Sequence, residues 1–110
     1  MPAPQARMES LNELEPKVPI VITAQDFQAL DRTDVVIADV RWYLDGRDGR
    51  KAYTEGHIPG AIFVDLDRDL ASSVRTDATH GRHPFPTPSA FAGAMSRLGI
   101  GNNSYVVAYD

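Results

Sequence analysis

The stretch Asp34-Val35-Val36-Ile37-Ala38-Asp39-Val40 decides the fold class of this chain. Its apolar residues follow one another without alternating with polar ones. A continuous apolar run of this length is typical of a strand that is covered on both faces, as in parallel sheets. We therefore predict a buried strand over residues 34–40.

Further short apolar runs lie on either side of this stretch. A β-branched run at residues 18–22 predicts a first strand or an extended lead-in, and residues 61–64 and 105–109 predict two more strands. Helices are predicted between these runs: after Thr23 with Phe27 and Leu30 on its apolar face, over 51–55 up to Gly56, as one turn near 65–70, and over 88–98 between Thr87 and Gly99. The alternation predicts an α/β fold with a mostly parallel sheet flanked by helices.

The domain organisation follows from the same pattern. Residues 1–17 hold three prolines, several charges and no periodicity, and are predicted to form a flexible arm. Residues 18–110 are enough for one domain at most. The last predicted strand has no helix behind it to cover its face, so we expect the domain to be incomplete at its C-terminal side.

Composition excludes several classes of function. The net charge of −4 gives no general attraction to nucleic acid or anionic membrane, and no apolar run approaches the ~20 residues of a membrane span. Residues 1–16 have no apolar signal core, so a cytoplasmic location is expected. The chain has no cysteine, which excludes disulfides, thiolate metal sites and thiolate nucleophiles.

Several motifs together resemble a known family. In the same order along the chain, and over roughly residues 18–110, the sequence is similar to the N-terminal, non-catalytic domain of two-domain rhodanese-family sulfurtransferases, which use thiosulfate or 3-mercaptopyruvate. The motifs are Asp39-Val40-Arg41-Trp42, Gly56-His57-Ile58-Pro59-Gly60-Ala61, Asp65-Leu66-Asp67, His83-Pro84-Phe85-Pro86, Arg97-Leu98-Gly99-Ile100-Gly101 and Val106-Val107-Ala108-Tyr109-Asp110.

The resemblance implies a function that this chain lacks the means to complete alone. In the family, a cysteine of the second domain takes sulfane sulfur as a persulfide and passes it to cyanide or a thiol. The chain resembles only a truncated first domain, so we expect no sulfur transfer by the isolated chain. The expected partner is the missing catalytic domain, or a second copy through the unfinished sheet. The alternative is a non-enzymatic rhodanese-like module for binding or complementation.

Two residues are candidate contributors to the active-site cleft. By resemblance, the aspartate and histidine that the first domain brings to the mercaptopyruvate reaction fall on Asp67 and His83. A carboxylate can orient an imidazole that relays a proton near pH 7. Pro84 stands where those enzymes usually have methionine. The alternative is that both side chains are ordinary solvated loop residues.

The other motif positions are expected to be structural. Asp39 and Arg41 are predicted to form an ion pair at the end of the central strand. The imidazole of His57 is predicted to bind backbone groups and fix the turn. Trp42 and Tyr43 are expected to pack in the core or the cleft, and the remaining turn residues are Pro59 and Gly60.

A metal site is the weakest of the alternatives. Asp77, His80 and His83 have a spacing that a metal could use, but they lie in a loop with no fixed periodicity. We therefore predict neither a metal nor a cofactor. A complete small α/β protein of another family remains the third possibility. For the isolated chain we predict marginal stability or self-association, because an incomplete domain lacks partners for its core.

Overall fold

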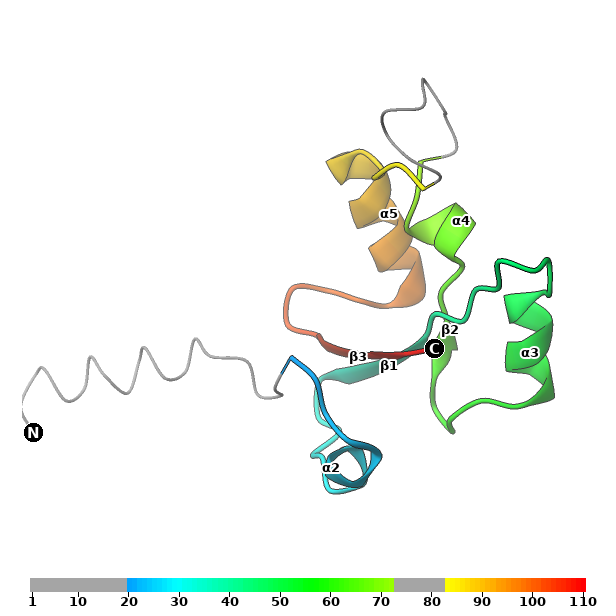
Figure 1. Cartoon of the computed structure of the whole chain (residues 1–110). Helices are drawn as coiled ribbons and strands as arrows, with labels where there is room; N and C mark the ends of the chain where they lie inside the picture. Colours follow the sequence, from blue (N-terminus) through cyan, green and yellow to red (C-terminus); the bar gives the residue numbers. More distant parts are fainter. Residues whose placement is uncertain (1–19, 73–82) are drawn as a thin grey trace, which may run out of the picture. The chain divides into compact units, whose positions relative to one another are not determined.

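The computed structural model describes residues 20–72 and 83–110 (Figure 1). The chain divides into two compact units, Met1–Thr33 and Asp34–Asp110. Among the described residues, the first unit holds the short helix α2 (Ala24–Gln28), which the Thr23 hydroxyl caps by accepting from the Asp26 amide at 3.0 Å. The second unit holds the sheet and the other helices of the described residues.

The sheet has three parallel strands: β1 (Val35–Asp39), β2 (Ile62–Phe63) and β3 (Tyr105–Tyr109). They lie in the order β2-β1-β3, with β1 paired to β2 by two residues and to β3 along its full length. Parallel neighbours joined by helical crossovers are the hallmark of α/β proteins. The predicted fold class is confirmed.

The strand register decides which helix covers which face of the sheet. Ala38 pairs with Ile62 and with Ala108, so these three side chains share one face, whereas Asp39 and Phe63 share the other. Helix α5 (Pro88–Leu98) lines a pocket together with Ala38 and Ala108. Helix α3 (Gly49–Glu55) contacts the ring of Phe63 instead. The two helices therefore cover opposite faces.

Helix α3 begins two residues earlier than the sequence predicted. The Asp48 carboxylate accepts from the amides of Arg50 and Lys51 and so caps the helix. Glycine is required at the first helical position, because a Cβ on Gly49 would clash with the carbonyl oxygen of Arg41. This close approach brings α3 against the segment that follows β1, which sequence spacing alone did not reveal.

The last two helices follow the prediction. Helix α4 (Leu66–Asp69) forms the expected single turn, capped by the Asp65 carboxylate. Helix α5 starts after the Thr87 cap with Pro88 in its first turn and ends at Gly99, whose φ of 79° is left-handed. Within residues 20–72 and 83–110, no helix is long and apolar enough to cross a bilayer.

Three differences from the sequence prediction concern strands and burial. Residues 20–22 form no strand, and Ile20 is almost fully exposed, because a β-branched run becomes a strand only where a neighbour pairs with it. Strand β2 is half as long as expected and half-buried. On the predicted core face of α5, Ala94 is buried but Phe91 is exposed, and Val106 of β3 is exposed as well. Both exposed side chains border the pocket of the α5 face.

Candidate functional site

The candidate site is centred on the carboxylate of Asp67, which binds two ring nitrogens. Its Oδ1 accepts from His83 Nε2 at 2.9 Å, and its Oδ2 accepts from Trp42 Nε1 at 3.2 Å. The rings of Trp42 and His83 also touch edge to face, with centroids 4.9 Å apart and planes at 88°. The structure thus joins the two predicted cleft residues, and adds Trp42 to them.

Three separate segments bring these side chains together. Trp42 follows the carboxyl end of β1, Asp67 lies in the first turn of α4 after β2, and His83 precedes α5. In parallel sheets the carboxyl ends of neighbouring strands meet at one edge, where binding and catalytic loops gather. The cluster therefore occupies the position in the fold where an α/β protein carries its chemistry.

The partner of His83 determines which imidazole nitrogen carries the proton. An ionised carboxylate only accepts hydrogen bonds, so in the neutral ring Nε2 holds the hydrogen and Nδ1 has a free electron pair. No described residue forms a hydrogen bond with Nδ1. The side chain of Asp67 is 61% exposed and that of His83 is 22% exposed. The arrangement can accept a proton at Nδ1 and stabilise the resulting imidazolium through Asp67.

A second carboxylate, Asp39, lies at the end of β1 and is fully buried. The guanidinium of Arg41 donates to both of its oxygens, with Nη2 at 2.7 Å from Oδ2, and the Arg41 amide donates to Oδ1 at 3.0 Å. The Tyr109 hydroxyl donates to Oδ2 at 3.0 Å. The expected Asp39–Arg41 pair is therefore present, with a tyrosine from β3 as a third member.

The environment shifts the pKa values of all three groups. Burial by itself raises the pKa of Asp39, but the hydrogen bonds from Arg41 and Tyr109 outweigh burial and hold that pKa below its usual value. The hydrogen bond to Asp39 raises the pKa of Arg41. Burial raises the pKa of the Tyr109 phenol. The Asp39 carboxylate is thus kept ionised and Tyr109 neutral, as their hydrogen bonds require.

The two side chains that bind Asp39 also anchor the turn at residues 58–61. Arg41 Nη2 donates to the carbonyl of Gly56 at 2.7 Å, and the Ile58 amide donates to the Tyr109 hydroxyl at 3.1 Å. Within the turn, the Ala61 amide donates to the Ile58 carbonyl at 2.9 Å. Pro59 and Gly60, with a φ of +86° at Gly60, give this turn the residue pattern of type II.

His57 differs from His83 in what its ring binds. Its Nδ1 lies 2.6 Å from the backbone carbonyl of Tyr53, and its ring stacks on the Tyr53 ring at 3.7 Å. A carbonyl only accepts, so His57 carries its hydrogen on Nδ1. The contact is with a backbone group, as the sequence analysis expected, and it joins the turn to α3.

The remaining predicted residues do not add to the site. Tyr43 stacks beneath the guanidinium of Arg47 at 4.1 Å. Asp77 and His80, two members of the suggested metal set, lie outside the described residues. Among the residues that are described, no three His, Cys, Asp or Glu side chains are grouped as a metal would need.

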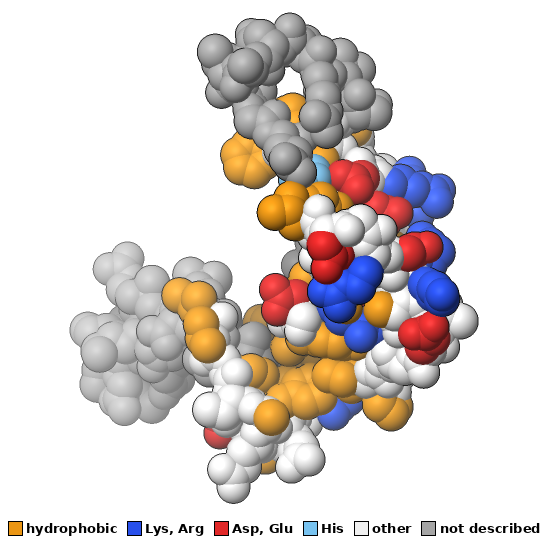
Figure 2. Space-filling model, turned by 45° about the vertical axis from the view of Figure 1, so that its right-hand side comes forward, with side chains coloured by type: hydrophobic (Ala, Val, Ile, Leu, Met, Phe, Trp, Pro, Cys, Tyr) orange, Lys and Arg blue, Asp and Glu red, His pale blue; other side chains and the backbone are white. Residues whose placement is uncertain are grey.

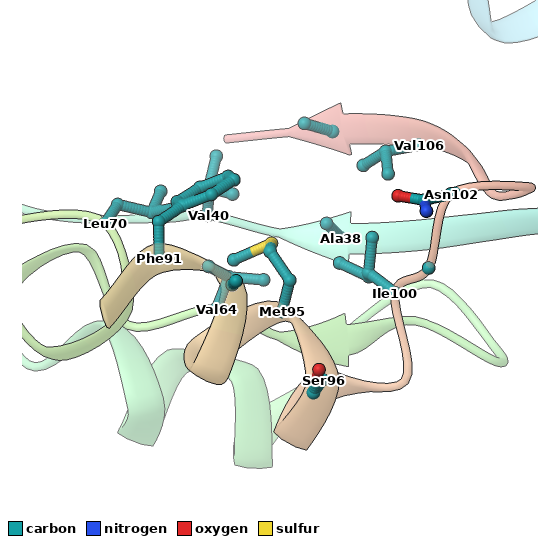
Figure 3. Close-up of a pocket in the computed structure, with 13 residues that line it drawn as sticks. Ala38, Val40, Val64, Leu70, Phe91, Met95, Ser96, Ile100, Asn102 and Val106 are labelled. Atoms are coloured by element: carbon teal, nitrogen blue, oxygen red, sulfur yellow. The ribbon is translucent and has the colours of Figure 1, made fainter. Parts of the chain in front are cut away.

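An apolar pocket of about 710 Å³ lies between α5 and the sheet (Figure 3). Figure 3 shows Phe91 and Met95 projecting from α5 towards the strands, with Ile100 beside Met95. Figure 2 shows one face of the surface, on which acidic and basic side chains are mixed with one another and hydrophobic side chains lie beside them. The lining of the pocket is apolar almost throughout: Ala38, Val40, Val64, Leu70, Phe91, Ala92, Met95, Ile100, Val106 and Ala108, with Ser96, Gly101 and Asn102.

Two residues that help to assemble the site could not be predicted from the sequence. Tyr109 was assigned only to a strand, and nothing local signals that its hydroxyl reaches Asp39. Asp69 is buried, accepts from the Asp65 amide at 2.9 Å and lies 3.7 Å from Arg97 of α5. Asp69 therefore links α4, which carries Asp67, to α5. Its position one turn after the Asp65 cap was the only available signal.

The three parallel strands and their flanking helices form an α/β domain that is consistent with part of a rhodanese-like fold. No family model matches the chain. Over 93 residues it is 41% identical to a Mycobacterium tuberculosis protein named as thiosulfate sulfurtransferase SseB, covering 83% of this chain and 32% of that protein. It is 44% identical over 92 residues to a Pseudomonas aeruginosa protein named as a 3-mercaptopyruvate sulfurtransferase, covering 82% and 32%.

The chain is also similar to a human sulfurtransferase. The chain is 42% identical over 76 residues to human 3-mercaptopyruvate sulfurtransferase, covering 67% of this chain and 24% of the human protein. The chain is thus a homologue of sulfurtransferases and matches one domain of them, spanning about a third of the length of the first two relatives. This homology counts against the third possibility, a protein of another family.

Proposed function

We propose that this chain supplies the non-catalytic wall of a sulfurtransferase active site, where the Asp67–His83 pair handles a proton during sulfur transfer. The observation that carries the proposal is the 2.9 Å hydrogen bond from His83 Nε2 to Asp67 Oδ1, which leaves Nδ1 as the accepting nitrogen. The cysteine thiolate that receives the sulfur belongs to another domain, since this chain has no cysteine.

The chemistry of a mercaptopyruvate donor needs a group of this kind. The cysteine thiolate attacks the donor sulfur and forms a new S–S bond, while the C–S bond breaks and its electron pair stays on carbon. The donor thiol gives up its proton, and the carbon takes one to become the methyl group of pyruvate. An imidazole with an open Nδ1 can carry that proton from sulfur to carbon.

Asp67 has a defined part in this step. Its carboxylate fixes the orientation of the imidazole and stabilises the cation that forms when Nδ1 is protonated. Because both side chains remain partly exposed, a substrate bound from outside this chain can reach His83. The buried Asp39 cannot take this part, because its oxygens are already occupied by Arg41 and Tyr109.

The proposal is tested in a chimera. The part of the Pseudomonas aeruginosa relative that matches this chain is replaced by the chain, and sulfur transfer from 3-mercaptopyruvate to a thiol is measured. We expect turnover by the chimera and none by the isolated chain. We expect His83→Asn to lower kcat by about 10²- to 10⁴-fold, the usual contribution of a general acid–base.

Asp45→Asn is the control for a polar substitution outside the cluster. Asp45 is an exposed aspartate, 58% accessible and paired with Arg47 at 2.9 Å. The control variant is expected to keep the turnover of the chimera. An active chimera in which His83→Asn and Asp45→Asn perform alike would refute a proton-handling role for the pair.

The second candidate function is a non-enzymatic module that binds or completes another chain. It is supported by the apolar pocket and by β3, which is paired on one side only within the described part of the chain. Analytical ultracentrifugation of the purified chain tests it. Self-association at micromolar concentration that Val106→Asp abolishes would favour this candidate, whereas a monomer at high concentration would count against it.

A further inference from the structure

We infer that Trp42 is the positioning residue of the Asp67–His83 pair, acting through its indole N–H on Asp67. The inference rests on the proposed function for its catalytic meaning, but the positioning itself is a property of this chain. It assigns to Trp42 a role beyond the packing that its sequence context suggests.

The first step of the argument concerns the carboxylate. Asp67 is 61% exposed, so packing alone does not hold its side chain in one orientation. One oxygen accepts from Trp42 and the other from His83. With Oδ2 held by the indole, rotation of the carboxylate is restricted and Oδ1 stays directed at Nε2 of the imidazole.

The second step concerns the tryptophan itself. Trp42 is half-buried and extends the segment that starts at Asp39 and Arg41, whose hydrogen bonds fix the backbone after β1. Its ring also meets the His83 ring edge to face at 4.9 Å. The indole therefore contacts both members of the pair from a well-anchored backbone. A phenylalanine would keep the ring contact but lose the N–H donor.

The third step concerns how the role can be observed. Trp42 is the only tryptophan in the chain, so a ¹H–¹⁵N spectrum contains a single indole signal that reports on this site. Among the described residues, the groups that face the indole N–H and its neighbour ring are Asp67 and His83. A change of either group should move the indole signal, and a change of His57 should not.

The test uses the full 110-residue chain and needs no sulfur transfer. We expect Trp42→Phe to speed exchange of the His83 Nε2 hydrogen with water by about 2- to 10-fold, the range that one hydrogen bond corresponds to. Tyr43→Phe is the matched control, because it removes a polar atom from the adjacent aromatic residue, and it should leave the exchange rate unchanged.

A second measurement keeps the inference testable if Trp42→Phe folds poorly. In chains that retain Trp42, Asp67→Asn and His83→Asn should each shift the indole N–H signal, whereas His57→Asn should not. An indole signal that ignores Asp67→Asn, or an exchange rate that Trp42→Phe leaves unaltered, would overturn the inference. An inactive chimera with these signals intact would instead refute the proposed function and leave the positioning role standing.

Discussion

Asp39 at the end of β1 and Asp67 in α4, which follows β2, accept hydrogen bonds from the same kinds of group, but their two clusters differ in burial. Asp39 accepts from the cation Arg41 and from the aromatic donor Tyr109. Asp67 accepts from His83 and from the aromatic donor Trp42. Each carboxylate thus accepts hydrogen bonds from one basic side chain and from one aromatic side chain.

Burial and the choice of base account for the difference. The side chain of Asp39 is 0% exposed and its base is an arginine, which stays charged at any ordinary pH. The side chain of Asp67 is 61% exposed and its base is a histidine, whose neutral ring has one nitrogen that can accept a proton. The first cluster holds a permanently charged ion pair inside the fold, whereas the second is the cluster for which we propose proton transfer.

The largest expected effect is on the buried cluster. Asp39→Ala leaves the Arg41 guanidinium and the Tyr109 hydroxyl without their acceptor, and we expect it to lower the free energy of unfolding by about 3–5 kcal/mol. Urea unfolding monitored by Trp42 fluorescence measures this. A loss below about 1 kcal/mol would contradict the view that Asp39 is a main source of the stability of the fold.

The second-largest expected effect is a loss of stability in acid, through the same Asp39 cluster. The folded-state pKa of Asp39 is lowered, so its contribution to stability is complete above the unfolded pKa of about 3.9 and is lost as the pH falls through the folded value. We expect the free energy of unfolding to fall steeply below about pH 4. Asp39→Asn should flatten this decline, while Asp45→Asn, at an exposed ion pair, should change it little.

A smaller effect is expected at Tyr109. Tyr109→Phe keeps the ring but removes the hydroxyl that donates to Asp39 and accepts from the Ile58 amide. We expect a loss of about 1–3 kcal/mol, because two part-buried hydrogen bonds disappear while Arg41 still satisfies Asp39. Urea unfolding provides the value. Equal losses for Tyr109→Phe and Asp39→Ala would mean that the hydrogen bonds between Arg41 and Asp39 contribute nothing to the free energy of unfolding.

The smallest effect on stability is expected at the exposed cluster. Asp67→Asn changes a solvent-accessible carboxylate, and exposed pairs contribute only about 0–1 kcal/mol. We expect unfolding curves that nearly superimpose on those of the unaltered chain. A destabilisation comparable to that of Asp39→Ala would show that Asp67 is structural and would remove the contrast between the two clusters.

Sequence patterns predicted the elements well and their long-range contacts poorly. Continuous apolar runs predicted β1 and β3, and a Thr-Pro start with a glycine stop predicted α5, because these signals are local. The resemblance singled out Asp67 and His83. The links from Tyr109 to Asp39 and from Trp42 to Asp67 span 70 and 25 residues. Such contacts depend on how the strands are ordered in the sheet, which no local pattern encodes.

The most direct test of the account is the ¹⁵N chemical shift of each imidazole nitrogen in the 110-residue chain, measured where the histidines are neutral. We predict opposite tautomers, with the hydrogen on Nε2 in His83 and on Nδ1 in His57, because one ring donates to a carboxylate through Nε2 and the other to a carbonyl through Nδ1. A His83 ring that carries its hydrogen on Nδ1 would contradict the account, since its accepting nitrogen would then be Nε2, which faces Asp67 and not a substrate.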